Sequence, residues 1–64
     1  MNNWRKEGVD YWDNKDCPRE VLEQAYIELV EFIEGVEIHC DDVKKMSEQK
    51  LRNEVGFYEY LAEK

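Results

Sequence analysis

The chain has few of the residues on which enzyme chemistry depends: one histidine, one serine, one proline and three glycines. A nucleophile needs a base that meets it in space and a third group that orients this base. The only His and Ser are His39 and Ser47, and we expect Ser47 to cap a helix. The three glycines, Gly8, Gly35 and Gly56, form no glycine-rich phosphate loop. The sequence therefore predicts a protein that is not an enzyme and has no catalytic residue.

Cysteine is equally scarce, with only Cys17 and Cys40 in the chain. Zinc sites normally take their ligands as closely spaced pairs. His39 and Cys40 are adjacent, so in an extended segment their side chains point to opposite faces. Even with Asp41 and Asp42 beside them, we predict no metal site and no cofactor. Both cysteines are expected to be small buried residues that stay reduced in a cytosol.

Long apolar runs and an excess of positive charge are also missing. No stretch approaches the length of a membrane span, and residues 1–7 lack the apolar segment of a signal peptide. Nine Lys and Arg stand against sixteen Asp and Glu, which gives a formal charge of −7. Such a balance disfavours direct binding to nucleic acid and to anionic membranes. The sequence predicts a cytoplasmic protein.

The clearest predicted element is an amphipathic helix over residues 18–34. Pro18 is tolerated in a first turn, because its missing N–H has no partner there, and Asp16 or Cys17 would be the cap. Gly35 ends the helix, since glycine adopts the left-handed conformation easily. One face is apolar and consists of Val21, Phe32, Ala25, Leu29, Leu22, Ile33, Tyr26 and Val30. The other face is polar and consists of Glu20, Glu23, Gln24, Glu28, Glu31 and Glu34.

The second half of the chain predicts a connector and another helix. Apolar and polar residues alternate over residues 36–40, which favours a short extended segment. Residues 43–46 would form one helical turn capped by Asp42. Ser47 is a good N-cap for a helix over residues 47–63. Its apolar stripe consists of Leu51, Val55, Tyr58 and Ala62, widened by Phe57 and Leu61.

These patterns predict a mainly α-helical fold with two amphipathic helices packed as an antiparallel hairpin. The single domain, residues 1–64, divides into an aromatic N-terminal segment (1–16), a helix (18–34), an extended connector (36–40) and a helix (47–63). Gly56 weakens the second helix by about 1 kcal/mol relative to Ala, so we expect it to pack closely against a neighbour. Two helices leave their stripes partly uncovered, which favours completion as a homodimer. The alternative is an α+β fold in which 36–40 pairs with 8–12.

The predicted partner-binding residues lie on the polar face of the first helix. Like charges at four-residue spacing repel one another, and the face offers no cation except Arg19 at its start. This face is either a solvated surface or a docking site for a basic protein. Ile27 projects into its middle and would be an apolar anchor surrounded by charge. The partner-binding set on this helix is Glu20, Glu23, Ile27, Glu31 and Glu34.

Three large aromatic residues in the N-terminal segment complete the candidate set: Trp4, Tyr11 and Trp12. They either fold back over the helices or act as anchors for a partner, since Trp and Tyr are frequent in binding hot spots. Stacking on bases would be weak without surrounding Lys and Arg.

Together with the helix 18–34, the segments Met46 to Leu51 and Phe57 to Lys64 resemble short acidic phage-encoded accessory proteins of the host-takeover or anti-defence class. The resemblance implies a non-catalytic inhibitor of a host protein, in the host cytoplasm. The predicted function is therefore a protein-interaction module that docks an acidic helix face on a basic host surface, including mimicry of a nucleic acid.

Two other functions remain open from the sequence. One is an oligomeric protein that sequesters a small ligand or nucleotide, with Trp12 or Tyr58 for stacking and anion contacts from Lys44, Lys45, Lys50 and Arg52. The other is a structural subunit of a larger assembly.

Overall fold

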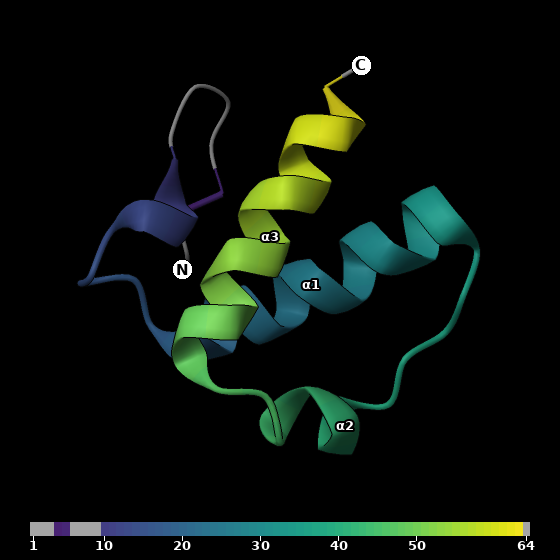
Figure 1. The fold of residues 1–64 in the computed structure, drawn as a ribbon, viewed down its shortest axis with the longest axis horizontal. Coiled ribbons are helices and arrows are strands. Elements are labelled where there is room, and N and C mark those ends of the chain that lie inside the picture. The colour runs from purple at the N-terminus through teal and green to yellow at the C-terminus, as the bar shows by residue number, and fades with distance from the viewer. Residues whose placement is uncertain (1–3, 6–9, 64) are drawn as a thin grey trace.

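The computed structural model describes residues 4–5 and 10–63, and it is mainly helical (Figure 1). A short 3₁₀ helix, η1 (Tyr11–Asp13), precedes three α-helices, α1 (Arg19–Glu34), α2 (Cys40–Lys44) and α3 (Glu48–Ala62). The described residues contain no strand. The predicted helical class is confirmed. The α+β alternative is wrong for residues 10–12 and 36–40, while residues 8–9 lie outside the described residues.

Helix α1 follows the predicted boundaries closely. Pro18 is its N-cap, with extended φ and ψ of −61° and 144°, and no side chain caps the helix. The prediction that Asp16 or Cys17 caps it is therefore wrong. Gly35 ends it in the left-handed conformation, with φ 69° and ψ 22°. The Gly35 N–H donates to the Glu31 carbonyl oxygen at 2.9 Å, which is the hydrogen bond expected at such a terminus.

The connector is shorter than predicted, because α2 begins at Cys40. Residues 36–39 have no regular structure, and Cys40 belongs to the helix rather than to an extended segment. The N-cap is His39, not Asp42. Asp41 and Asp42 both lie in the first turn of α2, where negative charge stabilises the positive end of the helix dipole. This effect favours a start earlier than the apolar pattern alone indicates.

Helix α3 begins as predicted. The Ser47 hydroxyl accepts a hydrogen bond from the Lys50 N–H at 3.2 Å, which satisfies one of the free donors of the first turn. Leu51 and Val55 are fully buried. Gly56 faces Trp12, and a Cβ at Gly56 would lie 2.6 Å from the Trp12 Nε1 atom. The expected close approach at this glycine is confirmed.

The main packing is between α1 and α3, but it is not an antiparallel hairpin. Both helices rise from the same end of the molecule (Figure 1). Near this end Arg52 of α3 binds the Cys17 carbonyl oxygen at 3.3 Å, and at the other end Tyr58 binds Glu34. The reason is α2, which returns the chain to the start of α1 before α3 begins. The core cluster comprises Tyr11, Cys17, Val21, Leu22, Ala25, Leu29, Val43, Leu51 and Val55.

Phe32 lies outside this core, although the helical projection places it on the apolar face. It is 78% exposed. Tyr26 and Glu34 are the residues of α1 that meet Tyr58 of α3. At about 100° per residue, Phe32 projects more than about 100° away from both of them. It is therefore an exposed apolar side chain in the last turn of α1.

Candidate functional site

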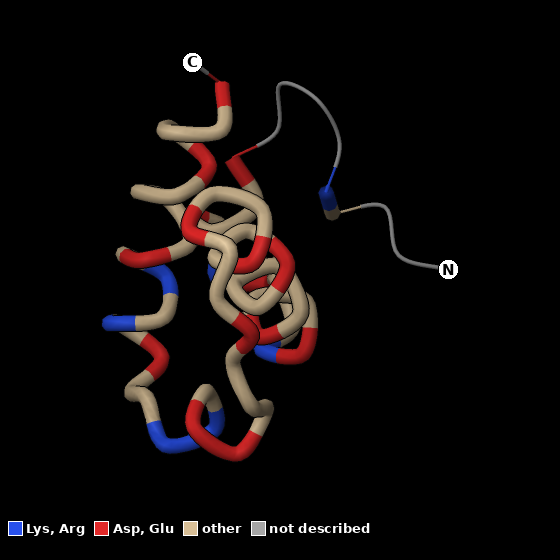
Figure 2. Tube along the Cα trace, turned by 90° about the vertical axis from the view of Figure 1, so that its right-hand side faces the viewer, with Lys and Arg blue, Asp and Glu red and all other residues tan. Residues whose placement is uncertain are grey.

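The polar face of α1 is exposed over most of its length, but its carboxylates differ in their surroundings. Glu20, Glu31 and Glu34 are exposed, whereas Glu23 is largely covered. Acidic residues follow α1 and continue into α2, while several Lys and Arg residues gather near α2 and the first half of α3 (Figure 2). Acidic residues also lie on α2 and along α3, so charges of both signs alternate there (Figure 2).

Glu23 is committed to the fold. Its side chain is 18% exposed, and its Oε2 atom accepts from Arg19 Nε at 2.7 Å. The same Arg19 guanidinium donates to the carbonyl oxygens of Val43 at 3.2 Å and Met46 at 2.5 Å. The pair therefore connects α1 to the end of α2. The sequence predicts that Glu23 binds a partner, but in the structure its carboxylate is already paired with Arg19.

Ile27 is half-buried and packs against the core cluster. The prediction that it stands apart from the core is wrong. Arg19, Glu23 and Ile27 follow one another at four-residue spacing on one side of α1, and this is the side on which α2 lies. The helix thus buries residues beyond its apolar stripe. Ile27 contributes to packing, so its substitution would test the fold before it tests binding.

Glu28 has the most complete set of hydrogen bonds on this face. One carboxylate oxygen accepts from Arg5 Nη1 at 2.8 Å, and the other accepts from Gln24 Nε2 at 2.8 Å. The hydrogen bond from Gln24 and then that from Arg5 lower the pKa of the Glu28 carboxyl. Glu28 therefore stays ionised while a cation lies on it.

Glu34 closes the far end of α1 against α3. It accepts a hydrogen bond from the Tyr58 hydroxyl, which raises the pKa of Tyr58 to about 12. The Tyr58 ring also meets Tyr26 edge-on, with ring centroids 5.9 Å apart. Glu34 is exposed but already has a partner, so it contributes to helix packing as well as to surface charge.

The exposed polar residues on the outer side of α1 form a different set from the predicted one. We call Glu20, Gln24, Glu28 and Glu31 the exposed ridge; they lie on one side of α1 at three- and four-residue spacing. Among the described residues, Glu20 and Glu31 form no ion pair. Phe32 follows Glu28 by four residues, so the exposed phenyl ring lies at the edge of this ridge. The helical projection could have found the ridge, but not the side that α2 covers.

Tyr11 belongs to the core rather than to a docking surface. It is 2% exposed, and its hydroxyl donates to Glu59. Burial, followed by this hydrogen bond, raises the pKa of Tyr11. Trp4 and Trp12 are partly buried and pack against the same cluster. Of the two roles that the sequence left open, Tyr11 shows the first, because its ring is folded into the core. The two tryptophans keep only part of their surface exposed, and a partner-binding role for them stays a prediction.

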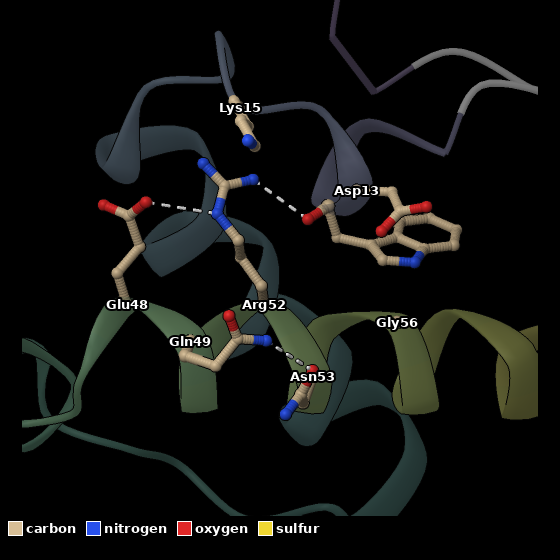
Figure 3. Close-up of a pocket in the computed structure, with 8 residues that line it drawn as sticks. Asp13, Lys15, Glu48, Gln49, Arg52, Asn53 and Gly56 are labelled. Atoms are coloured by element: carbon tan, nitrogen blue, oxygen red, sulfur yellow. Dashed lines mark hydrogen bonds and ion pairs between the residues drawn. The ribbon is translucent and has the colours of Figure 1, made fainter.

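A pocket of about 580 Å³ lies beside Trp12 and is relevant to the ligand-binding alternative (Figure 3). Its lining consists of Trp12, Asp13, Lys15, Glu48, Gln49, Arg52, Asn53 and Gly56. Arg52 stands in it with its guanidinium directed away from α3. Its side chain is only 13% exposed. An arginine has five N–H donors, and here they are largely used by protein oxygens.

The Arg52 bonds join α3 to the segment before α1. Arg52 Nε contacts Glu48 at 3.2 Å, Nη1 donates to Trp12 O at 2.9 Å and to Asn14 O at 2.7 Å, and Nη2 donates to Cys17 O at 3.3 Å. The residue that sequence reasoning offered as an anion contact is thus a clamp on the main chain. No periodic pattern signals this role.

The two cysteines differ. Cys17 is buried, as predicted, and burial raises the pKa of its thiol. Cys40 is exposed at the start of α2, so the prediction that it is buried is wrong. Within residues 4–5 and 10–63, no three His, Cys, Asp or Glu side chains are grouped so that they could hold a metal ion.

Comparison of the chain with protein-family models, with curated proteins and with solved structures finds no match. In the part of the chain that the structure describes, no helix has the length and apolar character needed to cross a membrane.

Proposed function

We propose that the protein is a non-catalytic interaction module, a phage-type inhibitor that binds a basic surface of a host protein in the host cytoplasm. The observation that carries the proposal is the exposed ridge of α1. Glu20 and Glu31 are open to solvent and form no ion pair within the described residues. An acidic ridge with two unpaired carboxylates among the described residues, on a chain of net charge −7, attracts a basic partner and orients it during association.

Phe32 supplies the apolar contact that the sequence assigned to Ile27. It is 78% exposed and lies four residues after Glu28 on the same helix. Aromatic side chains that become desolvated at the centre of an interface carry much of its binding energy. In this proposal the ridge sets the rate and orientation of binding, and Phe32 slows dissociation.

Affinity capture from a bacterial lysate, washed first at low and then at high salt, tests the proposal. We expect a basic protein that is retained at low salt and released at high salt, because exposed charge pairs are screened. The double variant Glu20→Lys/Glu31→Lys should lose this protein. The matched control, Asp13→Lys/Glu63→Lys, makes the same charge change at exposed sites outside the ridge and should retain it. Equal loss in both variants would contradict a role for this ridge.

The nucleotide-sequestering alternative is less well supported, because Arg52 has given most of its donors to main-chain oxygens. Lys44, Lys45 and Lys50 are exposed and stay available for it. A ligand that binds the native state raises the melting temperature, so thermal shift with a nucleotide panel separates the two functions.

A further inference from the structure

One cation already lies on the exposed ridge. Arg5, 23 residues before Glu28 in the chain, donates to the Glu28 carboxylate at 2.8 Å. Both side chains keep solvent contact, with 33% of Arg5 and 49% of Glu28 exposed. Ion pairs of this kind contribute little to stability, from about 0 to 1 kcal/mol. The contact therefore holds Arg5 in place weakly.

Arg19 provides the contrast. Besides its pair with Glu23, it donates to the carbonyl oxygens of Val43 and Met46, so its release would leave several acceptors unsatisfied. Arg5 donates to no described main-chain oxygen. Arg5 also interacts with the charge of Glu59 and with the buried Tyr11. A partner that displaces Arg5 from Glu28 breaks no described main-chain hydrogen bond, whereas displacement of Arg19 would break several.

A hollow lies beside Arg5 on the first turns of α1. Its volume is about 560 Å³, and its lining consists of Arg5, Pro18, Glu20, Val21 and Gln24. Pro18 offers exposed apolar surface next to the largely buried Val21, while Glu20 offers a carboxylate with no ion pair among the described residues. Long basic side chains pack their methylene stems on apolar surface and keep their charged heads near water or counter-charge. The chemistry of the hollow fits such a side chain.

We infer that Arg5 is an internal competitor for the basic partner. A partner's arginine takes the hollow, with its stem on Pro18 and Val21 and its guanidinium between Glu20 and Glu28, and Arg5 leaves Glu28. The inference rests on the proposed function, since it names the side chain that the ridge receives and the contact that regulates it. Arg5 thus weakens the binding of a partner that pairs with a single carboxylate of the ridge. A partner that pairs with more than one carboxylate overcomes this competition.

Titration with a fluorescently labelled hexa-arginine peptide at low salt tests this inference. Arg5→Ala should bind the peptide about two- to fivefold more tightly than the wild type, because a surface ion pair no longer competes. Lys50→Ala is the matched control: it also removes one positive charge from an exposed site, but on α3. Its affinity should change less than about twofold. Glu20→Gln should weaken binding. Circular dichroism checks that each variant keeps its helical content.

A second readout follows Arg5 itself. In the wild type, the ¹H–¹⁵N resonance of the Arg5 Nε group should move toward that of a solvated arginine as peptide is added. If the wild type binds but Arg5→Ala and Lys50→Ala change affinity equally, or if the Arg5 resonance stays in place, the inference is overturned and the proposed function stands. If no variant binds the peptide, both are overturned.

Discussion

Arg52 shows how much of this small fold depends on one side chain. Its guanidinium bonds to the main-chain oxygens of Trp12, Asn14 and Cys17 and to the Glu48 carboxylate. Hydrogen bonds to a charged group contribute more than neutral ones, and loss of a partner leaves acceptors unsatisfied. Arg52 therefore attaches the segment before α1 to α3, together with the packing of Tyr11 and Trp12 on the same helix.

Replacement of Arg52 by Met should lower the free energy of unfolding by about 2–4 kcal/mol. Arg52→Lys keeps the charge but not the planar fork of donors, so it should restore only part of the loss. Lys50→Met, an exposed substitution two residues away, should change stability by less than about 0.5 kcal/mol. Urea denaturation measures all three, and an Arg52→Met variant as stable as Lys50→Met would exclude the clamp.

Gly56 makes a prediction in which two effects oppose each other. Alanine favours the helix by about 1 kcal/mol over glycine, but its Cβ would lie 2.6 Å from Trp12 Nε1. Displacement of a packed indole costs about 1–3 kcal/mol, so Gly56→Ala should destabilise the protein overall. In a Trp12→Ala background the same substitution should stabilise it. Thermal denaturation of the four proteins in this cycle gives the sign directly, and stabilisation in both backgrounds would contradict the contact.

At the scale of helices, capping residues were readable from the sequence, whereas helix arrangement was not. Gly35 and Ser47 set the end of α1 and the start of α3 as predicted, because these signals are local. The direction of α3 depends on α2. Arg19 of α1 holds the end of α2 in place, because it donates to the carbonyl oxygens of Val43 and Met46. Apolar periodicity contains no information about such bonds.

The same limit explains the candidate site. The projection identified the acidic side of α1 correctly, but it could not show that Glu23 and Ile27 lie toward α2 or that Phe32 lies away from α3. Each depends on which neighbour reaches which side of the helix. Tyr11 illustrates the same point, since the sequence left open whether it folds back over the helices or faces a partner, and only the structure shows that it is buried in the core.

Two tyrosine–carboxylate hydrogen bonds connect α3 to η1 and to α1, and they predict that the stability of the fold decreases at alkaline pH. Tyr11 donates to Glu59 and Tyr58 donates to Glu34, and the pKa of each tyrosine is raised, that of Tyr58 to about 12. A raised folded-state pKa means that the stabilisation is complete below the unfolded value of about 10 and is lost as pH rises through the folded value. The urea midpoint should therefore hold to about pH 9 and fall above pH 10. The double variant Tyr11→Phe/Tyr58→Phe should show a smaller alkaline fall, and an equal fall would contradict this origin.

At the scale of the whole molecule, the core is covered from more sides than two helices alone allow. Helix α2 contributes Val43, and the chain before α1 contributes Tyr11 and Cys17, to the cluster that α1 and α3 share. The sequence predicts a homodimer because the apolar stripes of two helices would be left partly uncovered. Since α2 and the chain before α1 cover part of these stripes, this reason is weaker in the structure. Phe57 and Tyr60 are still 54% and 56% exposed. Self-association stays a prediction, which sedimentation equilibrium tests.

The exposed ridge of α1 is the central claim, and mapping the bound surface by NMR tests it most directly. The ¹⁵N-labelled protein would be titrated with the basic protein captured from the lysate. We expect the largest shift changes at Glu20, Gln24, Glu28, Glu31 and Phe32, with small changes along the Trp12 side of α3. Shift changes concentrated around Gln49, Asn53 and Gly56, with the ridge unaffected, would contradict the claim.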